Sequence, residues 1–435
     1  MSELAEKDKL AVDRLTALFD DGAFTEIDGY AKSASGDVEA SAGFGTVNGC
    51  PVYAFAQNVN VNGGAISVAQ CAKLKKIYDL ATKTGCPVIG IYDSNGVKLD
   101  EGFEALSAYG ELVKASTAMS GVCTQVSIIA GSCLGASALM ANMADVVIAV
   151  KDADFYVTTP SDVTADTCYE QGTVDILADD LDGALTAAKD VVALLPGNNL
   201  SPAPVYDFTA PSAAVDTGAS AMDVICAVAD AGSVVELKGG YATHCVTALA
   251  TVGGTTVGFV AFDGSAVCPA CAYKAEAFVK LCDAYNLPIL TVADADGFVK
   301  DAENAMLTAA TRMETAYATA TCPKIALITS KSIGGAYIAL AGKGANAAWD
   351  SAVLSPLDAE AAVAFLYSDR LAAGENRGSL VKEYKETLAS PYTAAASGAI
   401  DDVIVPADSR AKVMAALDIL AGKRENTLPR KHSVK

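Results

Sequence analysis

The chain has 435 residues, of which 52% are hydrophobic, and a formal net charge of −21 at pH 7. This length can bury the cores of two domains, and the acidic charge excludes electrostatic binding to nucleic acid or to anionic membrane surfaces. No signal-peptide pattern opens the chain, and its most apolar region, residues 126–150, is interrupted by Gly131 and Asp145. We therefore expect a cytoplasmic protein without a membrane-spanning helix.

The first half of the chain alternates helix and strand patterns. In order, the predicted elements are a helix within residues 1–30, a hairpin over 44–47 and 51–56, a helix over 65–84, a strand over 88–92, a helix over 102–120 and strands over 126–130 and 146–150. The Asn48-Gly49 pair predicts the hairpin turn. Lys73, Lys75 and Lys76 are expected on the exposed face of their helix.

The second half repeats landmarks of the first. The pairs are Gly49 and Gly254, 205 residues apart (254 − 49), Asp93 and Asp294, 201 apart (294 − 93), and Gly135 and Gly335, 200 apart (335 − 135). Nearly equal offsets predict an internal duplication, joined by the proline-rich residues 195–219. We expect two α/β domains with covered sheets, over residues 1–219 and 220–435.

Both halves contain a strand that turns through glycine into a helix. An apolar run at 325–329 precedes Gly334 and Gly335, and a similar run at 126–130 precedes Gly135. Such a turn leaves backbone N–H groups free to bind negative charge. The sequence therefore predicts two anion-binding turns.

Histidine and cysteine chemistry is sparse. Only His244 and His432 occur, so a histidine-based triad is not expected. Most of the twelve cysteines stand singly in apolar stretches, which is typical of buried thiols in a reducing compartment. Cys268 and Cys271 form at most half of a zinc site, because no second pair exists. We predict no metal and a chemistry based on backbone dipoles.

An ordered set of motifs extends almost from end to end. It comprises residues 14–24, 43–49, 63–64, 87–94, 100–102, 280–288, 334–337 and 398–404. This set resembles the biotin-dependent carboxyltransferases that act on acyl-CoA, such as the β subunit of propionyl-CoA carboxylase and the α subunit of methylmalonyl-CoA decarboxylase. The resemblance implies an α/β fold of two fused crotonase-like domains that arose by internal duplication.

The resemblance also implies a site shared between the first domain of one subunit, which holds acyl-CoA, and the second domain of another, which holds carboxybiotin. The implied catalytic N–H donors are Gly335 and Ala336 toward biotin and Gly135 and Ala136 toward the thioester. Further implied residues are Gly297, Phe298, Gly334, Tyr337 and Ile338 around biotin, and Gly63, Gly64, Gly96, Val97 and Lys98 around acyl-CoA. Biotin acts as the base in this family, so few histidines are needed.

The implied function is carboxyl transfer between biotin and a short-chain acyl-CoA, either propionyl/methylmalonyl-CoA or acetyl/malonyl-CoA. The subunit would serve an acyl-CoA carboxylase or a sodium-pumping decarboxylase. No biotin-attachment motif occurs in the sequence, so biotin is expected on a separate biotin carboxyl carrier protein. Other expected partners are biotin carboxylase or membrane decarboxylase subunits, which would place the chain peripherally at a membrane. A homo-oligomer is expected, at least a dimer and by resemblance a hexamer.

Two alternatives stay open. One is a crotonase-type acyl-CoA hydratase or decarboxylase that works without biotin, with Asp100, Glu101 or Glu303 as positioned carboxylates. The other is a non-catalytic scaffold subunit, which is suggested by Ala136 where the family commonly has glycine. Dependence of turnover on biotin tests the first, and acyl-CoA binding tests the second.

Overall fold

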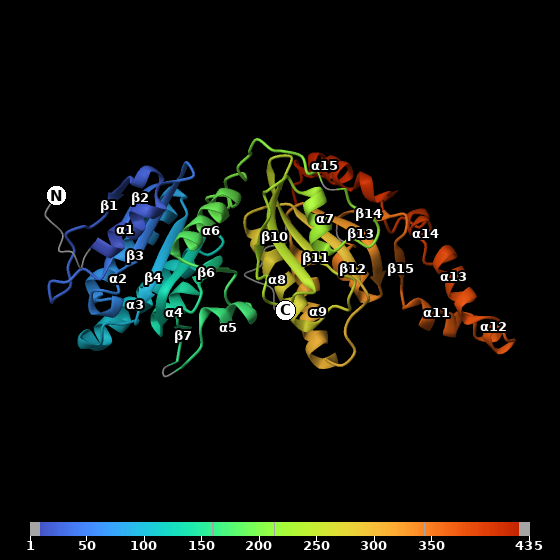
Figure 1. Ribbon diagram of the computed structural model, residues 1–435, viewed down its shortest axis with the longest axis horizontal. Coiled ribbons are helices and arrows are strands. Elements are labelled where there is room, and N and C mark those ends of the chain that lie inside the picture. The colour runs from blue at the N-terminus through green and yellow to red at the C-terminus, as the bar shows by residue number, and fades with distance from the viewer. Residues whose placement is uncertain (1–8, 159–160, 213, 343, 426–435) are drawn as a thin grey trace. The chain divides into compact units, whose positions relative to one another are not determined.

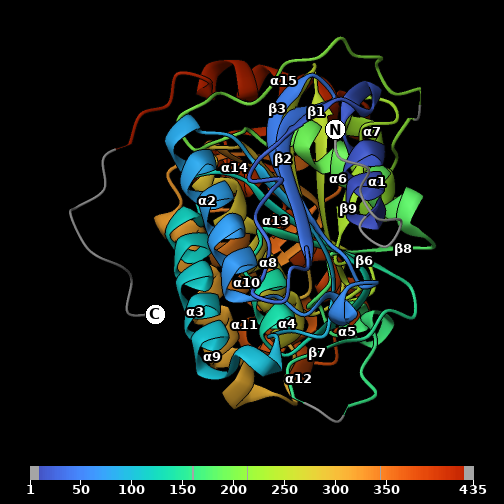
Figure 2. The ribbon, with the colours of Figure 1, turned by 90° about the vertical axis from the view of Figure 1, so that its left-hand side faces the viewer.

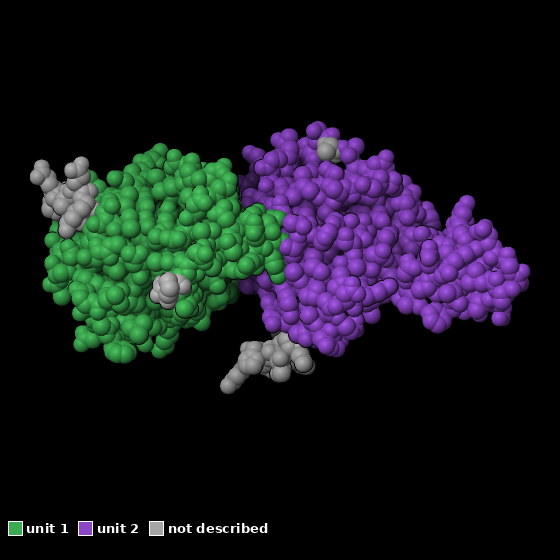
Figure 3. All heavy atoms as spheres, turned by 60° about the horizontal axis from the view of Figure 1, so that its bottom comes forward, with its two compact units in different colours: residues 1–204, 238–241 green, residues 205–237, 242–435 purple. Residues whose placement is uncertain are grey.

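The computed structural model describes residues 9–158, 161–212, 214–342 and 344–425, so His432 lies outside the described part. The chain forms two compact units: unit 1 is Met1–Pro204 with Lys238–Tyr241, and unit 2 is Val205–Leu237 with Ala242–Lys435 (Figure 3). The change of unit after Pro204 falls within the proline-rich residues 195–219. No helix within the described residues is both long and apolar enough to cross a membrane.

Unit 1 is built on a mixed sheet in the order β1-β2-β3-β4-β5-β6-β8, with β7 beside β5 (Figure 1). The strands are β1 (Phe24–Glu26), β2 (Ala40–Val47), β3 (Cys50–Gln57), β4 (Val88–Ser94), β5 (Gln125–Leu134), β6 (Val146–Val150), β7 (Phe155–Tyr156) and β8 (Ile176–Ala178). The first three run antiparallel and the others parallel. Asn48 and Gly49 both have positive φ at the β2–β3 turn, so the predicted hairpin is confirmed.

The helices of unit 1 cover both faces of this sheet. They are α1 (Lys9–Leu18), α2 (Val68–Thr84), α3 (Gly102–Met119), α4 (Ala136–Ala141), α5 (Ala165–Glu170) and α6 (Leu181–Leu194). Helices α2 and α3 lie side by side on one face, and α1 and α6 lie on the other (Figure 2). Leu74, Ile77 and Ala81 recur on one side of α2 and are buried in the core, as an amphipathic helix requires.

One expectation for α2 is wrong. Lys73 is only 2% exposed, and its ammonium donates to Ala40 O at 3.2 Å. Its Nζ lies 3.7 Å from a carboxylate oxygen of Glu26, so a long side chain on the buried side of the helix reaches acceptors on the neighbouring strands. Lys75 and Lys76 keep partly exposed side chains, as predicted.

Unit 2 repeats this topology strand for strand, in the order β16-β14-β13-β12-β11-β10-β9 with β15 beside β13 (Figure 1). The strands are β9 (Val235–Leu237), β10 (Cys245–Val252), β11 (Thr255–Phe262), β12 (Ile289–Ala295), β13 (Lys324–Ile333), β14 (Ala345–Trp349), β15 (Val353–Ser355) and β16 (Asp402–Ile404). The antiparallel and parallel pairings also repeat. The predicted α/β fold and its internal duplication are confirmed.

The helices of unit 2 match those of unit 1 except in one region. They are α7 (Ala221–Val228), α8 (Pro269–Ala284), α9 (Glu303–Thr319), α10 (Gly335–Leu340), α11 (Ala359–Leu366), α12 (Ser368–Ala372), α13 (Arg377–Thr387), α14 (Pro391–Ala396) and α15 (Ser409–Leu420). Between β15 and β16 the chain forms α11 to α14, whereas the described residues between β7 and β8 of unit 1 form only α5. We call α11–α14 the extension; it has its own small apolar cluster.

In each unit, an aspartate carboxylate holds the turn of the β-hairpin. The carboxylate of Asp20, just after α1, accepts hydrogen bonds from Asn48 N at 3.0 Å and Gly49 N at 2.9 Å. The carboxylate of Asp230, just after α7, accepts from Gly253 N at 3.0 Å and Gly254 N at 2.8 Å. The hydrogen bond from the Gly49 N–H is the main reason that the pKa of Asp20 is lowered.

Candidate functional site

The same strand–glycine–helix turn occurs once in each unit. Gly334 follows β13 with φ 59° and ψ −132°, and Gly135 follows β5 with φ 59° and ψ −122°. Their N–H groups donate to equivalent strands, Gly334 to Ser355 O at 2.8 Å and Gly135 to Tyr156 O at 3.0 Å. This backbone conformation is open to glycine and strained for other residues. Each glycine is therefore required by the path of the chain.

The geometry corrects one predicted correspondence. The sequence pairs Gly335 with Gly135, but the structure pairs Gly334 with Gly135, an offset of 199 residues (334 − 135). The residue that opens the helix is thus Gly335 in unit 2 and Ala136 in unit 1. Its N–H and the one after it have no acceptor inside the helix, so they are available to an oxyanion.

A cavity of about 600 Å³ opens at the turn of unit 2. Its walls come from the turn and α10, from β15 with the residue after it, and from the extension. The lining residues are Ser332, Gly334, Gly335, Tyr337, Ile338, Leu354, Ser355, Pro356, Leu388, Thr393, Ala394, Ser397 and Ala399. The cavity thus gathers four of the predicted residues, Gly334, Gly335, Tyr337 and Ile338. Those from β15 and the extension were missed, since no periodicity in the sequence links them to the turn.

Tyr337 ties the turn to the far wall of this cavity. Its hydroxyl donates to Ala399 O at 2.5 Å, just after the extension. Ile338, one residue further along α10, is 58% exposed, and Leu388 across the cavity is 53% exposed. Apolar side chains around a few backbone donors are typical of a pocket for a small molecule.

Gly297 and Phe298 lie behind the turn of unit 2. A Cβ atom on Gly335 would lie 2.8 Å from Cε2 of Phe298, so the ring lies directly against the glycine. Gly297 has φ 74° and lies near Ile333 O. Its carbonyl accepts from Val267 N at 2.9 Å. The loop after β12 therefore packs against the turn of unit 2 and is hydrogen-bonded to the segment just before α8.

Unit 1 brings its predicted residues together in the same way. A Cβ atom on Gly96 would lie 2.9 Å from Leu134 O and 3.8 Å from Ala136 N. Gly96 O accepts from Ile66 N at 2.9 Å, and Val97 forms a bridge with the same isoleucine. Gly96 and Val97 thus stand at the carboxyl end of β4, where ligands bind in open α/β sheets.

Gly63 and Gly64, in the loop before α2, lie against the carboxyl end of β4. A Cβ atom on Gly64 would lie 2.0 Å from Asp93 O, and one on Gly63 would lie 2.4 Å from the side-chain nitrogen of Asn95. Both glycines have positive φ. They allow the loop before α2 to approach the end of β4 closely.

Lys98 is buried and bound inside its own unit. It is 6% exposed, and its ammonium donates to Ser35 Oγ at 2.6 Å and to Glu39 at 3.4 Å. Glu101 lies 3.8 Å away and also accepts from Val68 N at the start of α2. These carboxylates already balance the positive charge of Lys98. Its assignment to the acyl-CoA site stays a prediction.

A buried polar network connects α1 and β3 to the turn of unit 1. Arg14 donates to Asp93 at 2.6 Å and to Gln57 O at 3.2 Å. Gln57 Oε1 accepts from Asp93 N at 3.1 Å and from Ser137 Oγ, in the first turn of α4, at 3.4 Å. Burial raises the pKa of Tyr109, whose hydroxyl also faces Ser137. Sequence reasoning missed Gln57, because its partners lie far from it in the chain.

The equivalent position of unit 2 is held differently. Asp294 accepts from Lys331 N at 3.1 Å. Burial raises the pKa of this carboxyl group above its usual value, while Lys331 and Ser330 act in the opposite direction. The end of β12 therefore carries a half-buried acid where the end of β4 carries a buried ion pair.

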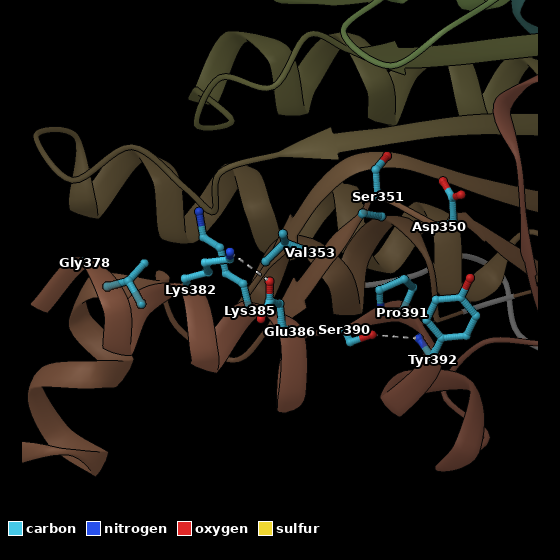
Figure 4. Close-up of a pocket in the computed structure, with 12 residues that line it drawn as sticks. Asp350, Ser351, Val353, Gly378, Lys382, Lys385, Glu386, Ser390, Pro391 and Tyr392 are labelled. Carbon is cyan, nitrogen blue, oxygen red and sulfur yellow. Dashed lines mark hydrogen bonds and ion pairs between the residues drawn. The ribbon is translucent and has the colours of Figure 1, made fainter.

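A second cavity, of about 620 Å³, lies against α13, α14 and β15 (Figure 4). Lys382 and Glu386 form an ion pair at 3.7 Å, and Ser390 Oγ accepts from Tyr392 N at 3.3 Å. The side chain of Lys382 is 75% exposed, and no predicted site residue lines this cavity. The cavity at the turn of unit 2 is therefore the candidate site.

Sequence and structure comparisons agree with this architecture. Residues 2–434 match the carboxyl transferase domain family. The 12S subunit of methylmalonyl-CoA carboxyltransferase from Propionibacterium freudenreichii subsp. shermanii is 34% identical, over 97% of this chain and 90% of its own. The propionyl-CoA carboxylase β chain of Saccharopolyspora erythraea is 32% identical, over 98% and 90%. The methylmalonyl-CoA decarboxylase α subunit of Veillonella parvula is 30% identical, over 97% and 92%.

A solved structure has the same fold. The hexameric transcarboxylase 12S, with methylmalonyl-coenzyme A and methylmalonic acid bound, superposes with a TM-score of 0.90 at 32% identity, over 97% of this chain and 92% of that one. The chain therefore belongs to the carboxyl transferase family, and the predicted membership of the biotin-dependent acyl-CoA carboxyltransferases is confirmed.

Proposed function

We propose that this chain moves a carboxyl group between biotin on a separate carrier protein and a short-chain acyl-CoA. The observation that carries the proposal is the repeated turn. Gly135 and Gly334 have one backbone conformation at one place in two equivalent sheets, and each precedes a helix. Carboxyl transfer develops negative charge on two oxygens, a thioester oxygen and a ureido oxygen, and each needs preorganised donors.

In this proposal unit 2 binds biotin. Ile338, Leu354 and Leu388 offer apolar walls to a bicyclic ring, and the N–H groups of Gly335 and Ala336 hold its ureido oxygen. When bound, biotin supplies the transferable carboxyl group and the base. The turn itself needs no titratable side chain for its part, which is to stabilise negative charge.

Unit 1 then binds the acyl-CoA. The predicted donor Gly135 is replaced here by Ser137, because the Gly135 N–H already donates to Tyr156 O at 3.0 Å. The N–H groups of Ala136 and Ser137 stabilise the thioester oxygen, and Gly63, Gly64 and Gly96 shape the edge beside it. The methyl group of Ala136 narrows the space next to the thioester, compared with Gly335 at the equivalent position of unit 2. This favours a short acyl group, such as propionyl/methylmalonyl or acetyl/malonyl.

The proposal includes partners. A biotin carboxyl carrier protein delivers the cofactor, and biotin carboxylase or membrane decarboxylase subunits complete the system. The solved transcarboxylase relative is a hexamer, and we assign a homo-oligomer of at least two copies to this chain. Acyl-CoA binding by residues 1–219 and biotin binding by residues 220–435 are the domain roles.

The biotin-independent alternative has less support. Glu101 is engaged at the start of α2 and near Lys98, and the side chain of Asp100 is 69% exposed. Neither carboxylate is poised at a turn as a general base requires. The dependence of thioester turnover on biotin distinguishes this alternative from carboxyl transfer.

The test is carboxyl transfer from malonyl-CoA and methylmalonyl-CoA to free biotin by the purified chain. Gly335→Pro removes one N–H donor, and we expect kcat/KM to fall about 10²–10³-fold. Gly335→Ala is the matched control, since it keeps the N–H and adds the same Cβ atom as proline, which lies 2.8 Å from Cε2 of Phe298 and displaces that ring in both variants. We expect Gly335→Ala to lose less than about tenfold.

Other outcomes separate the alternatives. Thioester loss at the same rate with and without biotin would establish the crotonase-type decarboxylase. Absence of turnover together with absence of acyl-CoA binding, in a chain whose circular dichroism shows it folded, would support the scaffold. Equal loss in the proline and alanine variants would show that the Gly335 N–H is not a donor in the reaction.

A further inference from the structure

Two thiols meet at the start of α8, outside the site proposed above. Cys268 is the residue before the helix, and its Sγ accepts a hydrogen bond from Cys271 N at 3.2 Å. The two sulfur atoms lie 2.9 Å apart. Pro269 opens the helix between them and fixes the backbone that brings both side chains to one side. No contact of the carboxyl-transfer site uses either thiol.

The geometry is close to that of a disulfide. A covalent S–S bond is about 2.05 Å long, so the sulfur atoms need to approach by less than about 1 Å. Cys268 and Cys271 are one helical turn apart at the end of a helix of 16 residues, so this approach requires no unfolding. An intramolecular cross-link is therefore accessible from the dithiol as it stands.

The two thiols differ in exposure in the way that exchange requires. Cys268 is half-buried, whereas Cys271 is fully buried. Burial raises the pKa of the Cys271 thiol to about 12, so this group rests protonated. An accessible first thiol and a buried second thiol are the arrangement in which an external disulfide is attacked first by one sulfur and then released by the other.

Metal binding explains this pair of thiols less well than disulfide chemistry does. Within the described residues, no group of three or more His, Cys, Asp or Glu side chains gathers so as to hold a metal ion. Cys245 is fully buried in β10, and this burial is the main reason that the pKa of its thiol is raised. His244 lies close to Asp263, with 2.8 Å between Nδ1 and the carboxylate, and is engaged there. Two sulfur ligands alone leave a zinc site incomplete.

We propose that Cys268 and Cys271 form a thiol–disulfide exchange site for small-molecule disulfides. The Cys268 thiolate attacks one sulfur of a disulfide RSSR, which releases RS⁻ and leaves a mixed disulfide. The Cys271 sulfur then attacks Sγ of Cys268, which releases the second RS⁻. The two protons of the original thiols pass to the two leaving thiolates. The chain is oxidised by two electrons and RSSR is reduced to two RSH.

This site is linked to the turn of unit 2 through one strand bridge. Val267, the residue before Cys268, donates to Gly297 O at 2.9 Å and accepts from Val299 N at 3.1 Å. Phe298, between these two residues, lies against Gly335. A cross-link at the start of α8 therefore acts on the segment that supports the turn. The exchange site does not depend on the proposed function, and its test needs no carboxyl transfer.

The experiment uses the full chain with Cys226→Ser, because Cys226 is an exposed thiol that would add unrelated adducts. The reduced protein is incubated with oxidised glutathione, quenched with an alkylating reagent, and its peptides are mapped by mass spectrometry. We expect the loss of two alkylatable thiols, both at 268 and 271, in one peptide that has lost two hydrogens. Dithiothreitol should restore both thiols.

Single variants trap the two steps. With Cys271→Ser, one glutathione should accumulate on Cys268, because the releasing thiol is gone. With Cys268→Ser, Cys271 should react at least about tenfold more slowly, because it is buried. Two free thiols after oxidation would overturn the proposal, as would a Cys245–Cys271 bridge or equal adducts on Cys50 and Cys86. The mapping of the parent chain decides the matter even where a variant fails to fold.

Discussion

The two units share a backbone and differ in the side chains that hold it. The end of β4 in unit 1 rests on the buried pair of Arg14 and Asp93, whereas the end of β12 in unit 2 has Asp294 bound to a backbone N–H. Yet Gly135 and Gly334 keep φ at 59° in both. The comparison teaches that the position of the N–H donors is what the duplication preserved. The supporting contacts were free to diverge.

The largest expected effect is on the ion pair of unit 1. Arg14 is 9% exposed and Asp93 is 5% exposed, so Arg14→Met leaves a buried carboxylate without its partner. We expect the free energy of unfolding to fall by about 3–5 kcal/mol, measured by urea denaturation. Lys75→Met, which breaks the exposed pair with Asp79, should change it by less than about 1 kcal/mol. Equal effects would refute the distinction between the two pairs.

The hairpin turns offer the next comparison. Gly254 has φ 80°, and a Cβ atom there would lie 2.1 Å from Tyr206 O, whereas Gly49 has φ 75° and open space around it. Gly254→Ala adds overpacking to backbone strain, so we expect a loss of about 3 kcal/mol. Gly49→Ala adds only the strain, about 1 kcal/mol. Thermal unfolding of both variants measures the difference, and a larger loss at Gly49 would contradict it.

The residue that opens each helix distinguishes the turns in function. Ala136→Gly makes unit 1 resemble unit 2 and enlarges the space beside the thioester. We expect the ratio of kcat/KM for methylmalonyl-CoA over malonyl-CoA to rise by about tenfold, since one methyl group is worth about 1–3 kcal/mol in a close-fitting site. Steady-state kinetics with the two substrates measure the ratio. An unchanged ratio would place the acyl group elsewhere.

The smallest expected effect is a change in pH dependence. Because burial raises the pKa of Asp294, its favourable contribution is present below its unfolded pKa and is lost as pH rises through the folded pKa. Asp294→Asn keeps an acceptor for Lys331 N, so it should stabilise the chain near neutral pH and flatten the fall in stability that begins above about pH 4, the usual pKa of an aspartate. Denaturation at several pH values measures this. Asp93→Asn should instead destabilise, because Arg14 loses its charge partner.

Much of the fold could be predicted because patterns of residues close in the sequence determine its helices, strands and turns. Apolar runs gave the central strands, such as residues 146–150, and Asn48-Gly49 gave the first hairpin. The glycine turns were predictable for the same reason, since a backbone with positive φ favours glycine and glycine can be recognised in the sequence. The pairing of Gly335 with Gly135 was wrong by one residue, because two adjacent glycines cannot show which one takes the unusual conformation.

Other parts depend on contacts between distant residues and could not be predicted. Lys98 meets Glu39, 59 residues earlier, and Lys73 meets Ala40 O, 33 residues earlier. Nothing near these lysines in the sequence separates a buried ammonium from an exposed one. The wall of the cavity in unit 2 was missed likewise, because β14, β15 and the helices of the extension separate Leu388 and Ala399 from the turn in the sequence.

The extension has its own apolar cluster, which includes Val363, Leu380 and Tyr384, apart from the main core of unit 2. Its hydroxyl contact, Ser355 Oγ to Tyr384 Oη at 2.8 Å, is made at the strand where it joins the sheet. An element that packs on itself can exchange residues without disturbing the sheet that holds the donors. The extension is therefore a module through which selection, or a protein engineer, could alter what the cavity accepts while the reactive turn stays fixed.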